Sequence, residues 1–239
     1  MRFAVDGSVF ERFPEYRRGV VVARGVVNLS ADPELQARLR AAEHSVVQRF
    51  ADADWRADPR LAAWLEAFGR LSVPVGSKPP SVAALVKRVV KGASLPFINQ
   101  LVALMNIVSL ENLVPCGGDD LGTVGDELVL RPATGVESYR PLGKPEFLEH
   151  PGPGELALVD VENAVVLCRC WCWRNSDVTK LTDETTAVAL NVDLLAPAVP
   201  VDAGTQIARR LADDVRRHCG GRVEWRMLTP DRPSALFEL

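Results

Sequence analysis

The order of hydrophobic patterns along this chain constrains its fold more than any single motif. Residues 33–111 carry apolar side chains at helical spacing, whereas residues 113–195 carry short apolar runs separated by Gly, Pro, Asn and Asp. A last helical stretch and a last apolar run follow after residue 200. Helices followed by strands, without regular alternation of the two, predict an α+β fold.

Five helices are predicted from periodicity and from end signals. The clearest begins after Ser30-Ala31-Asp32-Pro33, where Leu35, Leu39, Ala42, Val46 and Phe50 recur every three or four residues. The third ends at Lys91-Gly92, a cation followed by the usual terminating glycine. The other helices are expected after Asp58-Pro59, over 97–111, and around Ile207, Leu211 and Val215.

Six strands are predicted where β-branched residues cluster between turn signals. They are expected over 18–28, 127–131, 155–160, 163–171, 186–195 and 221–228. The segment Gly117–Gly122 reads as a small loop with two adjacent acids, which suits close approach to a ligand, binding of a cation or an ordinary Asp-rich turn. We expect a single domain over residues 1–239, because no flexible linker or internal repeat is visible.

Composition narrows the class of protein. The chain has 239 residues, of which 47% are hydrophobic and 25% charged, so it is neither disordered nor low-complexity. Acidic residues interrupt the N-terminus before any signal-type apolar stretch, and the most apolar helix (97–110) is short and contains three amides. We therefore expect a cytoplasmic protein with reduced thiols and no membrane contact.

Three cysteines at 168, 170 and 172 resemble a metal motif at first sight. Placed on a strand, the outer two would stand roughly 13 Å apart, too far for one zinc ion. We read them as small apolar core residues and expect no metal and no cofactor. The chain contains no P-loop, GxGxxG or HExxH, and none of its three histidines lies beside a nucleophile motif.

Charge is unevenly distributed. The chain carries a net charge of −3, which argues against a nucleic-acid binder that relies on global charge. However, residues 67–110 contain Arg70, Lys78, Lys87, Arg88 and Lys91 and no acid, and a second basic span covers 204–222. These spans suit either a confined contact to phosphates or ordinary solvated helix faces.

The segment 169–186 is unusually polar after its tryptophans. Trp171 and Trp173 would share the strand face opposite the cysteines, and a run of hydroxyl, amide and basic residues follows. Such a run after aromatic residues suits stacking on a ring and hydrogen bonding to its edge. The alternative is an exposed turn with local Ser and Thr capping.

Three stretches in the same order resemble a known family. Residues 95–121, 125–143 and 168–195, which include GGDDL and TDETT, are similar to the B3/B4 domain of the phenylalanyl-tRNA synthetase beta subunit. They look closest to free-standing proteins of that type, with 94–195 as the best-matching core. The strand–helix region 1–92 and the helix–strand region 203–229 are expected to pack on that core.

This resemblance implies a mixed, barrel-like β core with surrounding helices and a site that hydrolyses mischarged tRNA. The family's editing pocket uses an asparagine, a histidine and a glutamate. Asn106 stands at the asparagine position, but Gly117 stands at the histidine position and Asn191 approximately at that of the glutamate. The two departures argue against tyrosine specificity. Ester hydrolysis by a positioned water and the neighbouring ribose hydroxyl remains compatible with them.

We therefore expect a tRNA-associated B3/B4 protein that hydrolyses a mischarged aminoacyl-tRNA in trans, through a local, salt-sensitive contact. The alternative is a non-catalytic module that binds a free amino acid or a related small ligand. Asn106 would orient the amino-acid moiety, Asp119 or Asp120 its amino group, and Arg174 and Lys180 the nucleotide. The candidate substrate-binding residues are Asn106, Gly117, Asp119, Asp120, Trp173, Arg174, Ser176, Thr179, Lys180, Thr185 and Asn191, and the candidate RNA-binding residues are Lys87, Arg88, Lys91, Arg174 and Lys180.

Overall fold

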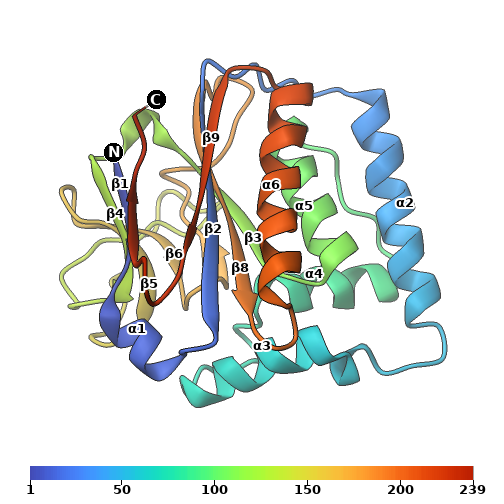
Figure 1. Cartoon of the computed structure of the whole chain (residues 1–239), viewed down its shortest axis with the longest axis horizontal. Helices are drawn as coiled ribbons and strands as arrows, with labels where there is room; N and C mark the ends of the chain where they lie inside the picture. The colour runs from blue at the N-terminus through green and yellow to red at the C-terminus, as the bar shows by residue number, and fades with distance from the viewer. Residues whose placement is uncertain (239) are drawn as a thin grey trace.

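Two β-sheets stand side by side in the computed structural model, which describes residues 1–238, and helices cover the outer face of one of them (Figure 1). The four-stranded sheet has the order β3-β8-β2-β9, and the six-stranded sheet has the order β10-β1-β4-β5-β6-β7. The α+β class, with mixed sheets and surrounding helices, is confirmed. The strands of residues 1–238 form two open sheets and no closed barrel.

The four-stranded sheet joins segments that are distant in the sequence. Its strands are β2 (Tyr16–Arg24), β3 (Cys116–Asp120), β8 (Ala187–Leu195) and β9 (Arg222–Leu228). All three pairings are antiparallel, and β2 lies between β8 and β9. The nearly continuous Val and Leu runs of β2 and β8 are buried on both faces, as expected for central strands.

The six-stranded sheet contains β1 (Arg2–Val5), β4 (Glu127–Pro132), β5 (Leu156–Asp160), β6 (Val165–Arg169), β7 (Arg174–Asn175) and β10 (Ser234–Leu236). The pairing of β1 with β4 is parallel and the others are antiparallel. Both ends of the chain therefore enter this sheet, as Figure 1 shows.

The five predicted helices are present. They are α2 (Pro33–Arg49), α3 (Pro59–Arg70), α4 (Ser81–Val90), α5 (Gln100–Asn112) and α6 (Val201–His218), with a short additional α1 (Gly7–Arg12) and 3₁₀ turns η1 (Trp55–Ala57) and η2 (Leu121–Thr123). Helix α2 is capped by Asp32, whose carboxylate accepts from the Leu35 amide. Helix α6 packs on β9, β2 and β8, α5 packs on α6 and β3, and α2 lies outside α5 (Figure 1).

Two predictions about strands were wrong. The segment Gly117–Gly122 is not a loop: it supplies β3 and η2, because β8 offers a ladder of backbone partners to a segment with low strand propensity. The predicted strand 163–171 ends at Arg169, since Cys170 and Trp171 have φ angles of 46° and 68° and turn the chain. Arg169, Trp171 and Trp173 therefore do not share one strand face.

Candidate functional site

One cavity of about 640 Å³ lies where α4 and α5 meet β3, β8 and the β6–β7 turn. Its wall is largely apolar and includes Leu85, Val102, Met105 and Leu181. Of the predicted substrate-binding residues, six line it: Asn106, Gly117, Trp173, Arg174, Lys180 and Asn191. The topology thus brings together segments that are up to 85 residues apart in that prediction, from Asn106 to Asn191.

The other five predicted residues are not in the cavity lining. Asp119 accepts a 2.7 Å hydrogen bond from the Thr179 hydroxyl, and Asp120 accepts one from the Thr185 hydroxyl. The Ser176 hydroxyl donates to the Arg140 carbonyl. The hydroxyl residues of the polar segment therefore hold the β3 acids and a loop in place, and neither acid is available to a substrate amino group at the cavity surface.

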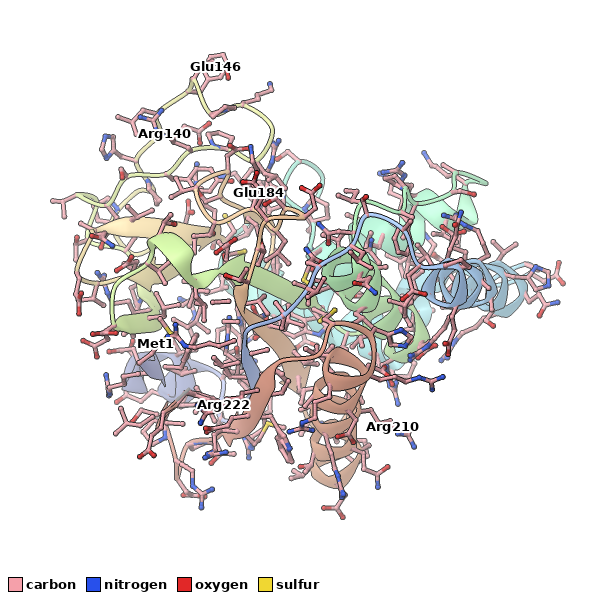
Figure 2. The ribbon with its side chains drawn as sticks, turned by 90° about the horizontal axis from the view of Figure 1, so that it is seen from above. Met1, Arg140, Glu146, Glu184, Arg210 and Arg222 are labelled. Atoms are coloured by element: carbon pink, nitrogen blue, oxygen red, sulfur yellow. The ribbon has the colours of Figure 1, made fainter. Side chains whose placement is uncertain are left out.

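Of the predicted basic residues, some line the cavity and others lie outside its lining. Arg88, Arg174 and Lys180 line the cavity, and the Arg88 and Lys180 side chains are also open to solvent, so they mark its mouth. Lys87 and Lys91 are exposed but lie outside the lining. In Figure 2, Arg210 and Arg222 of the second basic span appear at one edge of the molecule and Arg140 at the opposite edge.

Buried polar groups occupy the inner end of the cavity. The side chain of Arg18 on β2 is 5% exposed, and its Nη1 lies 3.1 Å from Asp193 Oδ1 on β8, which is fully buried. Asp193 also accepts from the Tyr16 hydroxyl and, at 3.0 Å, from Asn191 Nδ2. Three donors thus compensate one buried carboxylate.

The pKa shifts in this network follow from burial and pairing. Burial raises the pKa of the Asp193 carboxyl, although the neighbouring Arg18 and the hydrogen bonds from Tyr16 and Asn191 oppose the rise. Burial acts to lower the pKa of the Arg18 guanidinium, but the attraction of Asp193 and Tyr16 outweighs it and the pKa is raised. Arg18 therefore stays cationic at the inner end of the cavity.

The register of β3 against β8 decides which family positions meet. Gly117 lies directly opposite Asn191, and a Cβ at Gly117 would lie 3.4 Å from Asn191 Oδ1, an ordinary contact. The next residue differs, because a Cβ at Gly118 would lie 2.5 Å from Leu190 Cδ2. The cavity therefore has space in front of Gly117, whereas Gly118 is packed against side chains.

The two tryptophans have different positions. Trp171 is 1% exposed and packs against Phe13, Tyr16 and Trp64 with ring centroids 4.7 to 5.0 Å apart. Trp173 is half-buried in the cavity wall, with Lys78 Nζ 5.2 Å from its ring centroid. Both tryptophans line the cavity, but Trp171 does so as part of the buried core and Trp173 as a half-buried residue of the wall.

Cysteine thiols also line the cavity. Burial is the main cause that raises the pKa of the Cys116, Cys168 and Cys172 thiols, so all three remain protonated near neutral pH. Within residues 1–238, no three His, Cys, Asp or Glu side chains are grouped so that they could hold a metal ion. In that same part of the chain, no helix is long and apolar enough to cross a bilayer.

Sequence reasoning missed several polar residues of the site, among them Arg18, Asn175 and Asp193. Arg18 and Asp193 stand within apolar strand runs, and a charged residue in a strand buried on both faces is the signal that could have identified them. Asn175 lies on the two-residue strand β7 and lines the cavity. No local pattern distinguishes it from the neighbouring polar residues.

Comparison with known proteins agrees with this geometry. The family model described as the B3/4 domain matches residues 63–216, well over half of the chain. The chain belongs to the B3/4 domain family. The expected resemblance is thereby confirmed, and the match includes every cavity residue named above except Arg18.

Other comparisons add little. No curated protein matches the chain. Among solved structures, an N-terminal fragment of the phenylalanyl-tRNA synthetase beta-subunit from Pyrococcus horikoshii is similar, with a TM-score of 0.45 and 13% identity. The match covers 92% of this chain and 49% of that one, so this B3/4 chain spans about half the length of its structural neighbour.

Proposed function

We propose that this B3/4 protein binds the aminoacyl end of a mischarged tRNA in its cavity and hydrolyses the ester in trans. The observation that carries the proposal is the combination found in one cavity: an apolar wall, a buried polar inner end and a cationic mouth. The aminoacyl end of a tRNA has parts that match these regions. The amino-acid side chain can contact the apolar wall, the ester can hydrogen-bond to the polar groups, and the phosphates of the tRNA can meet the cations at the mouth.

The charge of the lining supports an anionic partner at the mouth. Within residues 1–238, Arg88, Arg174 and Lys180 contribute three cations toward the mouth against the one carboxylate of Asp177, while Arg18 and Asp193 pair at the inner end. Lys180 Nζ pairs with Asp177 Oδ2 at 3.0 Å, and Arg174 donates 2.8 Å to the Leu142 carbonyl. These contacts hold the two cations at the rim, where they can reach phosphate oxygens.

The chemistry proposed is ester hydrolysis. A water oxygen bonds to the carbonyl carbon, the bond from that carbon to the ribose oxygen breaks, and the ribose oxygen takes a proton. The products are a free amino acid and a tRNA with both terminal hydroxyls restored. Asn106 has no side-chain hydrogen bond within residues 1–238 and lines the cavity, so its amide is available to orient the ester.

A second function, the binding of a free amino acid or related small ligand without turnover, is favoured by the state of the thiols. The cavity thiols remain protonated, and none of the three histidines lines the cavity. Hydrolysis would therefore depend on positioning of the ester and water and on the ribose hydroxyl.

A deacylation assay separates these functions. The purified protein is incubated with a panel of tRNAs, each carrying a wrong amino acid, and ester loss is followed over buffer at several salt concentrations. Release from at least one tRNA, with KM rising as salt increases, is the expected result. Arg174→Ala should raise KM, whereas Arg210→Ala, an exposed residue of α6 outside the cavity lining, should leave it unchanged.

Absence of release from every tRNA would refute the proposed function. A shift in Tm on addition of one free amino acid would then support the binding module, because a ligand that binds only the folded state stabilises it.

A further inference from the structure

The space in front of Gly117 is bordered by two side-chain amide oxygens that accept no hydrogen bond from any group in the described part of the chain. A Cβ at Gly117 would lie 3.4 Å from Asn191 Oδ1, 3.6 Å from Asn191 Nδ2 and 3.8 Å from Asn175 Oδ1. The two asparagines come from different sheets, Asn191 from β8 and Asn175 from β7. They therefore converge on one point of the cavity wall from two sides, and glycine leaves that point open.

The hydrogen bonds of the two amides engage their nitrogens and leave their oxygens as the groups that can still bind a ligand. Asn191 Nδ2 donates 3.0 Å to the Asp193 carboxylate, and Asn175 Nδ2 donates 2.8 Å to the Gly118 carbonyl. Both partners only accept, so each amide must direct its nitrogen toward its partner. Within residues 1–238, neither Oδ1 accepts a hydrogen bond from a protein group, and both oxygens are free for a ligand.

The site requires a donor. Two converging carbonyl oxygens bind an N–H or O–H group, and an ammonium is the strongest donor of this kind. The hydrogen bond to the buried Asp193 carboxylate polarises the Asn191 amide and increases the negative partial charge on its oxygen. Two nearby cations are already paired, Arg18 with Asp193 and Lys180 with Asp177, which reduces their repulsion of a positive ligand.

We propose that the Oδ1 atoms of Asn175 and Asn191, in front of Gly117, bind the amino group of an α-amino acid or of its ester. The proposal rests on the proposed function in that it places one group of the same ligand. It also assigns to two amides the role that the sequence suggested for Asp119 or Asp120.

The test changes the ligand first and the protein second. Isothermal titration compares L-amino acid methyl esters with their des-amino counterparts, in which hydrogen replaces the amino group. For the esters that bind, loss of the amino group should weaken binding at least tenfold, as expected for hydrogen bonds to a charged donor. Gly117→Ala should weaken binding of the ester to the level of the des-amino compound, because the added methyl group intrudes into the space in which the donor approaches both oxygens.

Gly69→Ala is the matched control, since a Cβ there meets nothing within 4 Å. Equal affinity for ester and des-amino counterpart, unchanged affinity in folded Gly117→Ala protein, or binding of no ester at all would each overturn the inference. Because the ligand comparison uses the unchanged protein, it stands even where the variant fails to fold.

The failure of this inference can be distinguished from that of the proposed function. Amine-dependent ester binding without cleavage of any tRNA supports the amino-group site and refutes trans hydrolysis. Cleavage of N-acetylated aminoacyl-tRNA at the same rate as the free-amino form supports hydrolysis and overturns the amino-group site.

Discussion

Ionisation of the buried Asp119 carboxyl should lower the free energy of unfolding as the pH rises. Its side chain is almost entirely buried on β3 and has one hydrogen bond, from Thr179. Burial raises the pKa of this carboxyl to about 7, against the opposing effects of Thr179 and Arg18. In the unfolded chain the pKa returns to its ordinary value near 3.8.

The magnitude follows from proton linkage. Between about pH 4 and pH 7 the unfolded chain has released the proton while the folded protein retains it, so the free energy of unfolding falls with rising pH. A difference of about three pKa units corresponds to about 4 kcal/mol, at about 1.4 kcal/mol per unit. This cost is complete above pH 7 and absent below pH 4.

Asp119→Asn removes the titration and keeps an oxygen that can accept from Thr179. Urea unfolding followed by tryptophan fluorescence at pH 5, 6, 7 and 8 should show the variant gaining on the wild type by up to about 4 kcal/mol. Asp183→Asn, at an exposed position, is the control and should follow the wild-type profile. Parallel profiles for Asp119→Asn and the wild type would refute the argument.

Further predictions concern packing and burial. Gly118→Ala should lower the free energy of unfolding in urea by about 1–3 kcal/mol, because its Cβ would lie 2.5 Å from Leu190 Cδ2. Gly117→Ala should lower it much less, because a Cβ there meets only ordinary contacts. Equal losses for the two variants would contradict this difference in packing. Asp193→Ala should destabilise by about 3–5 kcal/mol in the same assay, because Arg18 would remain buried without its partner; a neutral result would contradict this. All five thiols are buried and three of them line the cavity, so a thiol reagent too bulky to enter the cavity should modify them at pH 8 only as fast as the protein opens; immediate reaction with such a reagent would show otherwise.

The helices could be predicted because each carries its own signals. In α2 the capping Asp32, the following Pro33 and the apolar spacing all favour the same start and the same buried face. Helix α5 begins at Gln100 rather than at Phe97, because the Asn99 side chain accepts from the Val102 amide and so acts as the cap. Errors at such ends amount to a few residues.

Strands whose partners are distant could not be predicted as well. Strand β3 consists of Cys-Gly-Gly-Asp-Asp, which contains residues that are rare in strands, and it becomes extended only through its ladder with β8. Strand β6 ends earlier than its β-branched sequence suggests, because the chain turns at Cys170 and Trp171. The decisive contacts there are tertiary.

The sequence indicates which segments border the candidate site, but it does not indicate which side chains pair with residues from distant segments. Asn106 and Lys180 line the cavity, and their role there stays a prediction. Asp119 accepts a hydrogen bond from Thr179, which lies 60 residues further along the chain. No pattern in the sequence around Asp119 indicates that its side chain is buried away from the cavity lining. Arg18 and Asp193, 175 residues apart, meet only because β2 and β8 are adjacent.

The position of β2 limits how this protein can be divided. Residues 63–216 match the family model, yet β2 (Tyr16–Arg24) lies outside them and pairs with both β8 and β9. A fragment cut to the matched residues would lose β2 and β9 together, and β8, still paired with β3 on one side, would become an edge strand along its nine residues on the other. Long apolar edges of this kind pair with other chains, so such a fragment should aggregate rather than report on the cavity.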